Sequence, residues 1–248
     1  MPEIDIVLVA PLYEGNVGFV ARVMKNFGFR NLVLVDSCEL GEEAIARAGH
    51  AYDLLKNAEQ CTIEDVFSRS NIVVATTGSV SKSVCRPMRM PYFSPRELRD
   101  RIKNLDGKIS ILFGRENWGL SNEEVKRSDI ICTIPTSPDY PILNISHAVG
   151  IICYEIANLQ KGDYSLATPF ELSHLYRHID QYLDIIHHPH FKRENTMIMI
   201  RRILGRANLT TRETSTLHGL LRRSTWHIDP TVFKENEEKS SDDKGEHI

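Results

Sequence analysis

Apolar runs alternate with stretches of helical spacing through the first 164 residues. The runs are DIVLVAP, NLVLVD, IVVATTG, ISILFG and IICTIP, and segments between them, such as NVGFVARVMKNFG, repeat apolar residues at intervals of three and four. Runs that are apolar at successive positions are buried on both faces, as in a parallel sheet covered by helices. We therefore predict an α/β domain over residues 1–162.

The last third of the chain has a helical pattern. The segment NISHAVGIICYEIANLQ predicts a helix that ends near Gly162, and DYSLATP after it is typical of a linker. Farther on, TMIMIRRILGRANLTTRETSTLHGLLRR predicts a helix, a turn and a second helix, with Thr210 and Glu213 as a capping box. We predict a small α-helical domain over residues 168–233. Residues 234–248 have almost no apolar side chains, which predicts a disordered tail.

Charge is unevenly distributed along the chain. The formal net charge is −3, yet residues 165–233 carry 9 basic and 6 acidic side chains, whereas residues 1–164 carry 18 and 21. The basic excess is therefore confined to the predicted helical domain. No apolar run approaches the roughly 20 residues that span a bilayer, so we predict a soluble, cytoplasmic protein with no membrane partner.

Neither the cysteines nor the histidines predict a metal site. The five cysteines are an odd number, widely spaced and without a C-x-x-C pair, which is typical of reduced thiols in a protein core. The HHPH segment at 187–190 and the helical pair His174 and His178 have ligand-like spacing, but no cysteine or carboxylate completes either set. We predict that the protein binds no metal.

Polar loops follow the predicted strands. ATTGS, FGRENWGL and IPTSPDYPILNISHAVG each begin where a strand ends, and ligands of open α/β sheets bind at that edge. The first loop, PLYEGNVGFVAR, is neither G-x-G-x-x-G nor a Walker motif, which excludes the common dinucleotide and P-loop sites. Taken alone, Asn16 is typical of a helix cap and Arg22 of a surface arginine.

The loops taken together resemble a known family. NVGFVAR (16–22), FGRENWGL (113–120) and the segment from Ile134 to Ala148 that contains LNISHA are similar, in order and spacing, to the three motifs of the SpoU/TrmH-type RNA 2′-O-ribose methyltransferases of the SPOUT superfamily. Within it, FGRENWGLSNEE and the helical C-terminal extension resemble the TrmJ-type tRNA enzymes. The resemblance implies a parallel sheet with a trefoil knot near its carboxyl end, a homodimer, S-adenosylmethionine as cofactor, and tRNA methylated on the pyrimidine ribose, with cytidine favoured, at position 32 of the anticodon loop.

The resemblance also implies roles for individual residues. Arg22 is the activator of the 2′-hydroxyl, and because a guanidinium is a poor general base, we expect it to grip the adjacent phosphate or the developing alkoxide. The implied catalytic residues are Arg22, Asn16, Glu116, Ser146 and Asn144. The implied cofactor contacts are Thr76, Thr77, Gly78, Gly114, Ile134, Ile142 and Leu143. Pro141 and Ile142 depart from the small polar residues usual among bacterial members.

A basic surface for RNA is predicted from the helical domain. Arginines on its two helices suit binding to phosphates without base recognition, although a solvated face that packs a dimer would have the same pattern. The predicted RNA contacts are Arg115, Arg201, Arg202, Arg206, Arg222 and Arg223. Three alternatives remain open: a knotted RNA-binding module without catalysis, a ribose methyltransferase for rRNA or another tRNA site, and a base methyltransferase of the same superfamily.

Overall fold

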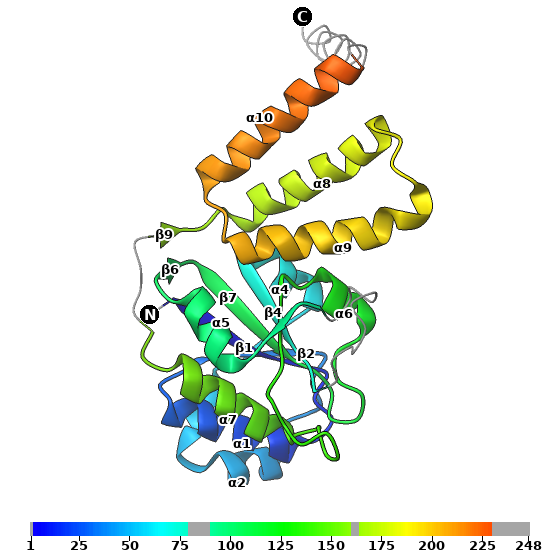
Figure 1. Ribbon diagram of the computed structural model, residues 1–248. Coiled ribbons are helices and arrows are strands. Elements are labelled where there is room, and N and C mark those ends of the chain that lie inside the picture. The colour runs from blue at the N-terminus through cyan, green and yellow to red at the C-terminus, as the bar shows by residue number, and fades with distance from the viewer. Residues whose placement is uncertain (1, 79–89, 160–163, 230–248) are drawn as a thin grey trace, which may run out of the picture.

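A computed structural model describes residues 2–78, 90–159 and 164–229 (Figure 1). The predicted tail over residues 234–248, and the predicted domain boundary at residue 162, lie outside these residues. The described part of the chain forms an α/β domain followed by a helical region, as the alternating pattern of the sequence predicts.

Seven strands of the described chain form one parallel sheet. Its order is β3-β2-β1-β7-β4-β8-β5, and every neighbouring pair is parallel. The strands are β1 (Glu3–Val9), β2 (Asn31–Val35), β3 (Glu59–Cys61), β4 (Ile72–Thr76), β5 (Tyr92–Phe93), β7 (Lys108–Phe113) and β8 (Ile130–Cys132). A separate parallel pair joins β6 (Leu105–Asp106) to β9 (Tyr164–Ser165). The five predicted strands are confirmed as β1, β2, β4, β7 and β8, whereas the short edge strands β3 and β5 lack a long apolar run.

Helices cover both faces of the sheet. Along β1, Ile6 and Leu8 enter a core cluster with one set of helices, while Val7 and Val9 enter the cluster on the opposite face. The first face carries α1 (Glu14–Asn26), α2 (Glu42–Ala48), the 3₁₀ turn η1 (Gly49–Ala51), α3 (Tyr52–Lys56), α5 (Pro95–Ile102) and α7 (Ile145–Ile156). The second carries α4 (Ile63–Arg69) and α6 (Asn122–Arg127). This double cover explains why the strands are apolar at consecutive positions.

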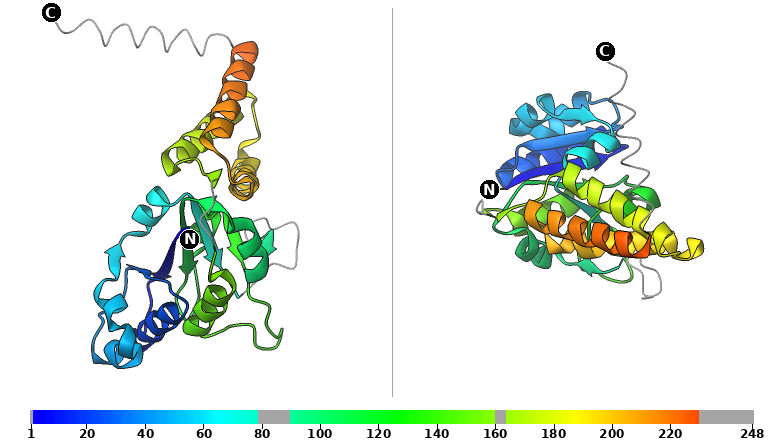
Figure 2. Two further views of the ribbon diagram at one scale, coloured as in Figure 1. Left: turned by 90° about the vertical axis from the view of Figure 1, so that its left-hand side faces the viewer. Right: turned by 90° about the horizontal axis from the view of Figure 1, so that it is seen from above.

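The helical region packs against α4, α6 and the start of β8. It contains α8 (Pro169–Ile185), α9 (His190–Ala207) and α10 (Thr211–Ile228). The predicted helix-turn-helix is confirmed: Asn208 ends α9 in a left-handed conformation, and Thr210 and Glu213 form the predicted capping box. In Figures 1 and 2, α9 lies next to the α/β domain and α10 extends away from it. A Cβ on Gly205 would lie 2.5 Å from the Asp129 Cβ, so glycine allows α9 to approach the start of β8.

The strand order places loops from distant parts of the chain side by side. The chain runs outward from β1 through β2 to β3, then returns past β1 to β4, and β7 later fills the place between them. The carboxyl ends of β4, β7 and β8 are therefore neighbours on one edge of the sheet. A reversal of strand order of this kind is where open α/β sheets bind their ligands.

Candidate active site

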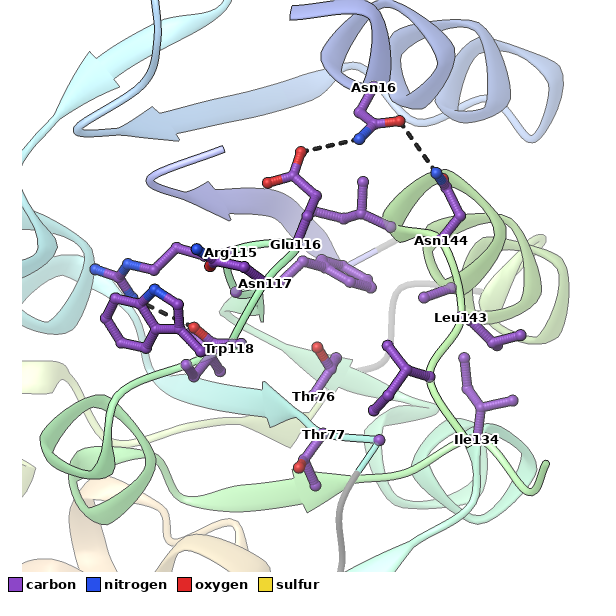
Figure 3. A pocket seen from close by; sticks show the side chains of 18 of the residues that line it. Asn16, Thr76, Thr77, Arg115, Glu116, Asn117, Trp118, Ile134, Leu143 and Asn144 are labelled. Atoms are coloured by element: carbon purple, nitrogen blue, oxygen red, sulfur yellow. Dashed lines mark hydrogen bonds between the residues drawn. The ribbon is translucent and has the colours of Figure 1, made fainter. Parts of the chain in front are cut away.

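A pocket of about 830 Å³ lies at the carboxyl edge of the sheet (Figure 3). Its walls come from the ends of β4, β7 and β8, from the start of α1 and from the segment that leads into α7. The seven predicted cofactor contacts all line it, namely Thr76, Thr77, Gly78, Gly114, Ile134, Ile142 and Leu143. So do three of the five predicted catalytic residues, Asn16, Glu116 and Asn144. The fold thus gathers residues more than 100 positions apart.

A chain of hydrogen bonds joins the three motifs. Asn16 Nδ2 donates to Glu116 Oε1 at 2.9 Å, and Asn144 Nδ2 donates to Asn16 Oδ1 at 3.1 Å. Glu116 Oε2 also accepts from the backbone N–H of Leu12 at 2.9 Å. Asn144 Oδ1 accepts from the backbone N–H and the Oγ of Ser146 at 2.9 and 2.7 Å. Each side chain of this polar network therefore fixes the orientation of the next (Figure 3).

The prediction that Asn16 caps a helix is wrong. The N-cap of α1 is Tyr13, so Asn16 already lies inside the helix, and its amide is used by the polar network instead. Asn144, by contrast, is the N-cap of α7 and accepts from Ser146 N. The cap position of Asn144 turns its amide nitrogen toward α1.

A tight turn carries Glu116 and Trp118 at its tip. In this 115–119 turn, Arg115 and Gly119 exchange backbone hydrogen bonds of 3.2 and 2.9 Å, and Gly119 has a φ of +73°. A Cβ on Gly114 would come within 2.2 Å of the backbone nitrogen of Leu120. Only glycine fits either position without displacing the backbone.

Arg115 is engaged inside the protein. Its Nη1 contacts both carboxylate oxygens of Glu124, at 3.1 and 3.0 Å, and its guanidinium lies 4.4 Å from the centre of the Trp118 ring. Glu124 also forms a capping box with Ser121 at the start of α6. Sequence reasoning missed Glu124, although the S-x-x-E spacing of a capping box was visible. With its charge paired, Arg115 supports the turn rather than offering a free cation to RNA.

The opposite wall of the pocket is small and apolar. Thr76 Oγ1 donates to the Leu112 carbonyl at 2.7 Å, so the hydroxyl proton of this threonine is already used within the sheet. A Cβ on Gly78 would lie 2.9 Å from Ile142 Cδ1, so the loops after β4 and β8 touch here. Ile134, Ile142 and Leu143 form the rest of this wall, and in Figure 3 Ile134 and Leu143 lie opposite Trp118.

Two predicted catalytic residues do not line the pocket. Ser146 is buried and supports Asn144. Arg22 is exposed on α1, and the described residues give it no hydrogen bond or ion pair. It lies on the same helical face as Gly15 and Phe19, seven and three positions earlier, which both line the pocket. Arg22 therefore lies on that face of α1, about one helical turn past the residues that line the pocket.

Comparison with known proteins identifies the family. Residues 3–154 match the SpoU rRNA Methylase family. The chain belongs to this family. A tRNA (cytidine-2′-O-)-methyltransferase TrmJ of Methanocaldococcus jannaschii is 37% identical over 223 residues, which are 86% of this chain and 96% of that protein. A tRNA (cytidine/uridine-2′-O-)-methyltransferase TrmJ of Salmonella typhimurium is 32% identical over 240 residues, covering 89% of this chain and 96% of that protein.

Solved structures of similar proteins share the fold of this SpoU-family chain. The crystal structure of TrmJ from Z. mobilis ZM4 superposes with a TM-score of 0.70 at 28% identity, covering 90% of this chain and 98% of that one. A probable methylase family protein from Haemophilus influenzae superposes with a TM-score of 0.60, covering 93% and 99%. Because both matches cover nearly the whole of each structure, the similarity includes the helical region.

The predicted RNA contact at Arg202 needs correction. Arg202 is only 2% exposed, and its guanidinium donates to the carbonyls of Val125 and Ser128 at the end of α6. Burial lowers the pKa of Arg202 to about 10, while the nearby carboxylate of Asp129 opposes that change. An arginine enclosed in this way joins α9 to α6 and does not reach RNA.

The other predicted arginines of the helical region differ in exposure. Arg222 and Arg223 are exposed on α10. Arg201 lies over the Tyr176 ring at 4.1 Å, with Asp129 3.9 Å away. Arg206 is half-buried, and burial together with the neighbouring Arg101 lowers its pKa. Arg222 and Arg223 are therefore the members of the predicted set that are most open to a large ligand.

Residues 2–78, 90–159 and 164–229 contain no cluster of three histidine, cysteine, aspartate or glutamate side chains arranged to hold a metal ion. In the same ranges, no helix is both long and apolar enough to cross a membrane.

Proposed function

We propose that this protein is an S-adenosylmethionine-dependent tRNA 2′-O-ribose methyltransferase that acts on the pyrimidine at position 32 of the anticodon loop, with cytidine favoured. The observation that carries this proposal is the polar network of Asn16, Glu116 and Asn144 at a pocket of the SpoU family. Two relatives that are similar along nearly their whole length are named for ribose methylation of cytidine or uridine in tRNA.

The pocket fits S-adenosylmethionine. Its volume of about 830 Å³ accommodates a cofactor of this size with room for part of a nucleotide. The apolar wall of Ile134, Ile142 and Leu143 suits an adenine ring, and Gly78 and Gly114 allow a ligand to approach the backbone closely. When bound, this cofactor supplies an electrophilic methyl group on a sulfonium centre.

The polar network then orients the ribose. Asn16 Nδ2 and Asn144 Nδ2 each use one N–H within the network, which leaves each amide a second N–H for a ribose oxygen. Glu116 holds Asn16 and the backbone of Leu12, so both amides are set before the substrate arrives. Orientation of this kind lowers the barrier to an in-line transfer, because the hydroxyl is held in a near-attack position.

Arg22 has the electrostatic role in this proposal. It stands one turn of α1 beyond the pocket, exposed and unpaired among the described residues. A guanidinium there suits the phosphate next to the target ribose, whose charge it would bind in a fixed geometry. It stabilises the charge that develops at the 2′-oxygen without accepting a proton, so the hydroxyl proton passes to water as the methyl group leaves the sulfonium.

A homodimer and a knotted chain path belong to the same proposal. The outer face of α7 exposes Ile151 and Tyr154, and the Tyr154 ring meets Phe27, at the end of α1, edge-on at 6.1 Å between centroids. We assign this apolar face to a second copy of the chain, and we expect Tyr154→Arg to shift the mass measured by sedimentation from dimer to monomer.

The contact of Gly78 with Ile142 supports a knot that ties the pocket loops together.

Methyl transfer to unmodified tRNA tests the function. The purified protein is incubated with tRNA transcripts and S-adenosylmethionine carrying a labelled methyl group, and cofactor binding is measured separately by calorimetry. We expect cofactor binding and a labelled product that resists alkaline cleavage beside the modified nucleotide. Binding without transfer to any RNA would indicate an inactive RNA-binding module, and an alkali-labile product would indicate base methylation.

A further inference from the structure

Trp118 is an aromatic side chain at the pocket that the proposed roles leave unused. It lines the pocket, yet 60% of its surface is exposed. Tyr13 and Tyr140 also line the pocket and are exposed. Single exposed aromatic residues are common, but several around one cavity mark a binding surface.

The Trp118 ring is held in place before any ligand binds. The 115–119 turn fixes its backbone through two hydrogen bonds between Arg115 and Gly119. The Arg115 guanidinium lies 4.4 Å from the ring centre, and Glu124 holds that guanidinium through both carboxylate oxygens. A ring supported in this way loses little conformational entropy when it binds a flat partner.

The chemistry around Trp118 favours a neutral, flat ligand. The charge of Arg115 is paired with Glu124, and Glu116 on the same turn is acidic, so the residues that the structure describes on this turn offer no unpaired cation to a phosphate. An unpaired nucleobase is flat, uncharged and has two π-faces, and single-stranded RNA is commonly bound by stacking on aromatic side chains.

The cofactor and the base have separate places in the pocket. Ile134, Ile142 and Leu143 form the apolar wall assigned to adenine. In Figure 3, Trp118 lies across the pocket from Ile134 and Leu143, with Thr76 and Thr77 between. Glu116, which orients the polar network, comes from the same turn as Trp118. A base stacked on Trp118 would therefore present its RNA backbone to Asn16 and Asn144.

We propose that Trp118 is a positioning residue that stacks with an unpaired base of the RNA substrate. This inference rests on the proposed function, because it assigns the RNA of that reaction to one wall of the same pocket. Trp118 sets where the RNA enters, and the polar network then acts on the ribose.

Fluorescence tests the stacking directly. The chain has two tryptophans, and Trp226 lies outside the pocket on α10, so Trp226→Phe leaves Trp118 as the single reporter. The emission of this variant is recorded first with S-adenosylhomocysteine and then during titration with a tRNA transcript. We expect the tRNA to quench the emission, and a duplex RNA without unpaired bases to leave it unchanged.

Two fluorescence results would overturn the inference. Emission that stays constant while tRNA binding saturates would show that no base reaches Trp118. Quenching by S-adenosylhomocysteine alone, with no further change on adding tRNA, would assign the ring to the cofactor. Because these readings do not depend on methyl transfer, a protein that binds tRNA and quenches without catalysis would refute the proposed function while leaving the stacking intact.

Kinetics give a second test. Trp118→Ala should raise the KM for tRNA by about 5- to 150-fold, the loss of one base–aromatic stack, and leave the KM for S-adenosylmethionine unchanged. Trp118→Phe keeps a ring and should retain most of the affinity. The matched control is Tyr52→Ala, which removes an exposed aromatic residue of α3 outside the pocket. An unchanged KM for tRNA in folded Trp118→Ala would contradict the proposal.

Discussion

The carboxyl ends of strands β4 and β8 differ from their amino ends in how far polar groups are open to a ligand. At their carboxyl ends, Thr76, Thr77 and Cys132 border an open pocket lined by glycines, small side chains and amides. At their amino ends, the buried carboxylate of Asp129 accepts from Val73 N at 2.9 Å, and α9 covers it. Beside the first end, the side-chain amides of Asn16 and Asn144 each keep one N–H that the network does not use, whereas the polar groups at the second end are enclosed by the protein.

The difference separates function from stability. Burial raises the pKa of Asp129 and lowers that of Arg202, so each charge depends on its neighbours in the fold. The Asn16, Glu116 and Asn144 network is linked by side chains that face a cavity, so a change there leaves the core intact. Substitutions at the two ends should therefore affect different measurements.

The largest effect is expected at the buried end. Arg202→Met removes the guanidinium that binds the carbonyls of Val125 and Ser128, and it leaves Asp129 with less compensating charge. We expect unfolding free energy to fall by about 3–5 kcal/mol and the thermal midpoint by about 10 °C, with kcat of the folded protein nearly unchanged. Calorimetry and a transfer assay at 25 °C check this. Arg201→Met, at a half-exposed arginine, should cost less than about 1 kcal/mol.

At the pocket end, Arg22→Ala should reduce kcat by about 10²–10³-fold, which is typical of removing one group that stabilises transition-state charge. Cofactor affinity and thermal midpoint should stay near those of the unchanged protein, because Arg22 is exposed and has no hydrogen bond or ion pair among the described residues. Arg30→Ala, at another exposed arginine, is the control. Full activity in the Arg22 variant would remove it from the mechanism.

A smaller loss is expected for Glu116→Gln. The amide that replaces the carboxylate places an N–H against Asn16 Nδ2 or the Leu12 N–H, so one hydrogen bond of the network is lost. We expect kcat to fall by about 10- to 100-fold, from the loss of a hydrogen bond to a charged group. Steady-state kinetics measure this loss, with Glu123→Gln on the exposed surface of α6 as the control. Equal rates for both variants would mean that the network does not orient the substrate.

The smallest effect concerns pH and the helical region. His178 Nδ1 and His218 Nδ1 lie 2.8 Å apart between α8 and α10, close to His174 and Arg222. Burial and the neighbouring imidazoles lower the pKa of His178 and His218. For a base with a lowered folded pKa, stability is full above the unfolded pKa of about 6.5 and declines as pH falls below it.

The pH effect can be measured by thermal unfolding at pH 7.5 and 5.5. We expect a modest fall of the midpoint at the lower pH, and a smaller fall in His218→Gln, where one titrating partner is gone. An identical pH dependence in both proteins would show that this histidine pair does not influence the packing of α8 on α10.

The sequence predicted the main strands because their signal is local. Double burial makes β1, β2, β4, β7 and β8 apolar at consecutive positions, whereas β3 and β5 are short edge strands with little to distinguish them from loops. The capping box of Thr210 and Glu213 was also predictable, because both partners lie within four residues.

The site was predictable only in part. Motif order identified all seven predicted cofactor contacts and three of the five predicted catalytic residues among those that line the pocket, but not the ion pair of Arg115 with Glu124. For Arg202, the polarity of the side chain suggested a surface position, and only the packing of α9 on α6 shows that its guanidinium is enclosed. Contacts between distant segments decide both cases, and a linear pattern does not contain them.

Mass-spectrometric mapping of the methylated nucleotide tests the central claim most directly. Unmodified tRNA is incubated with the protein and S-adenosylmethionine, cut into defined fragments, and each fragment is sequenced by mass. The account predicts one added methyl group on the ribose of the pyrimidine at position 32 of the anticodon loop, which forms at least about 100-fold more slowly with Arg22→Ala. Methylation of a base, or of a ribose elsewhere in the tRNA, would contradict it.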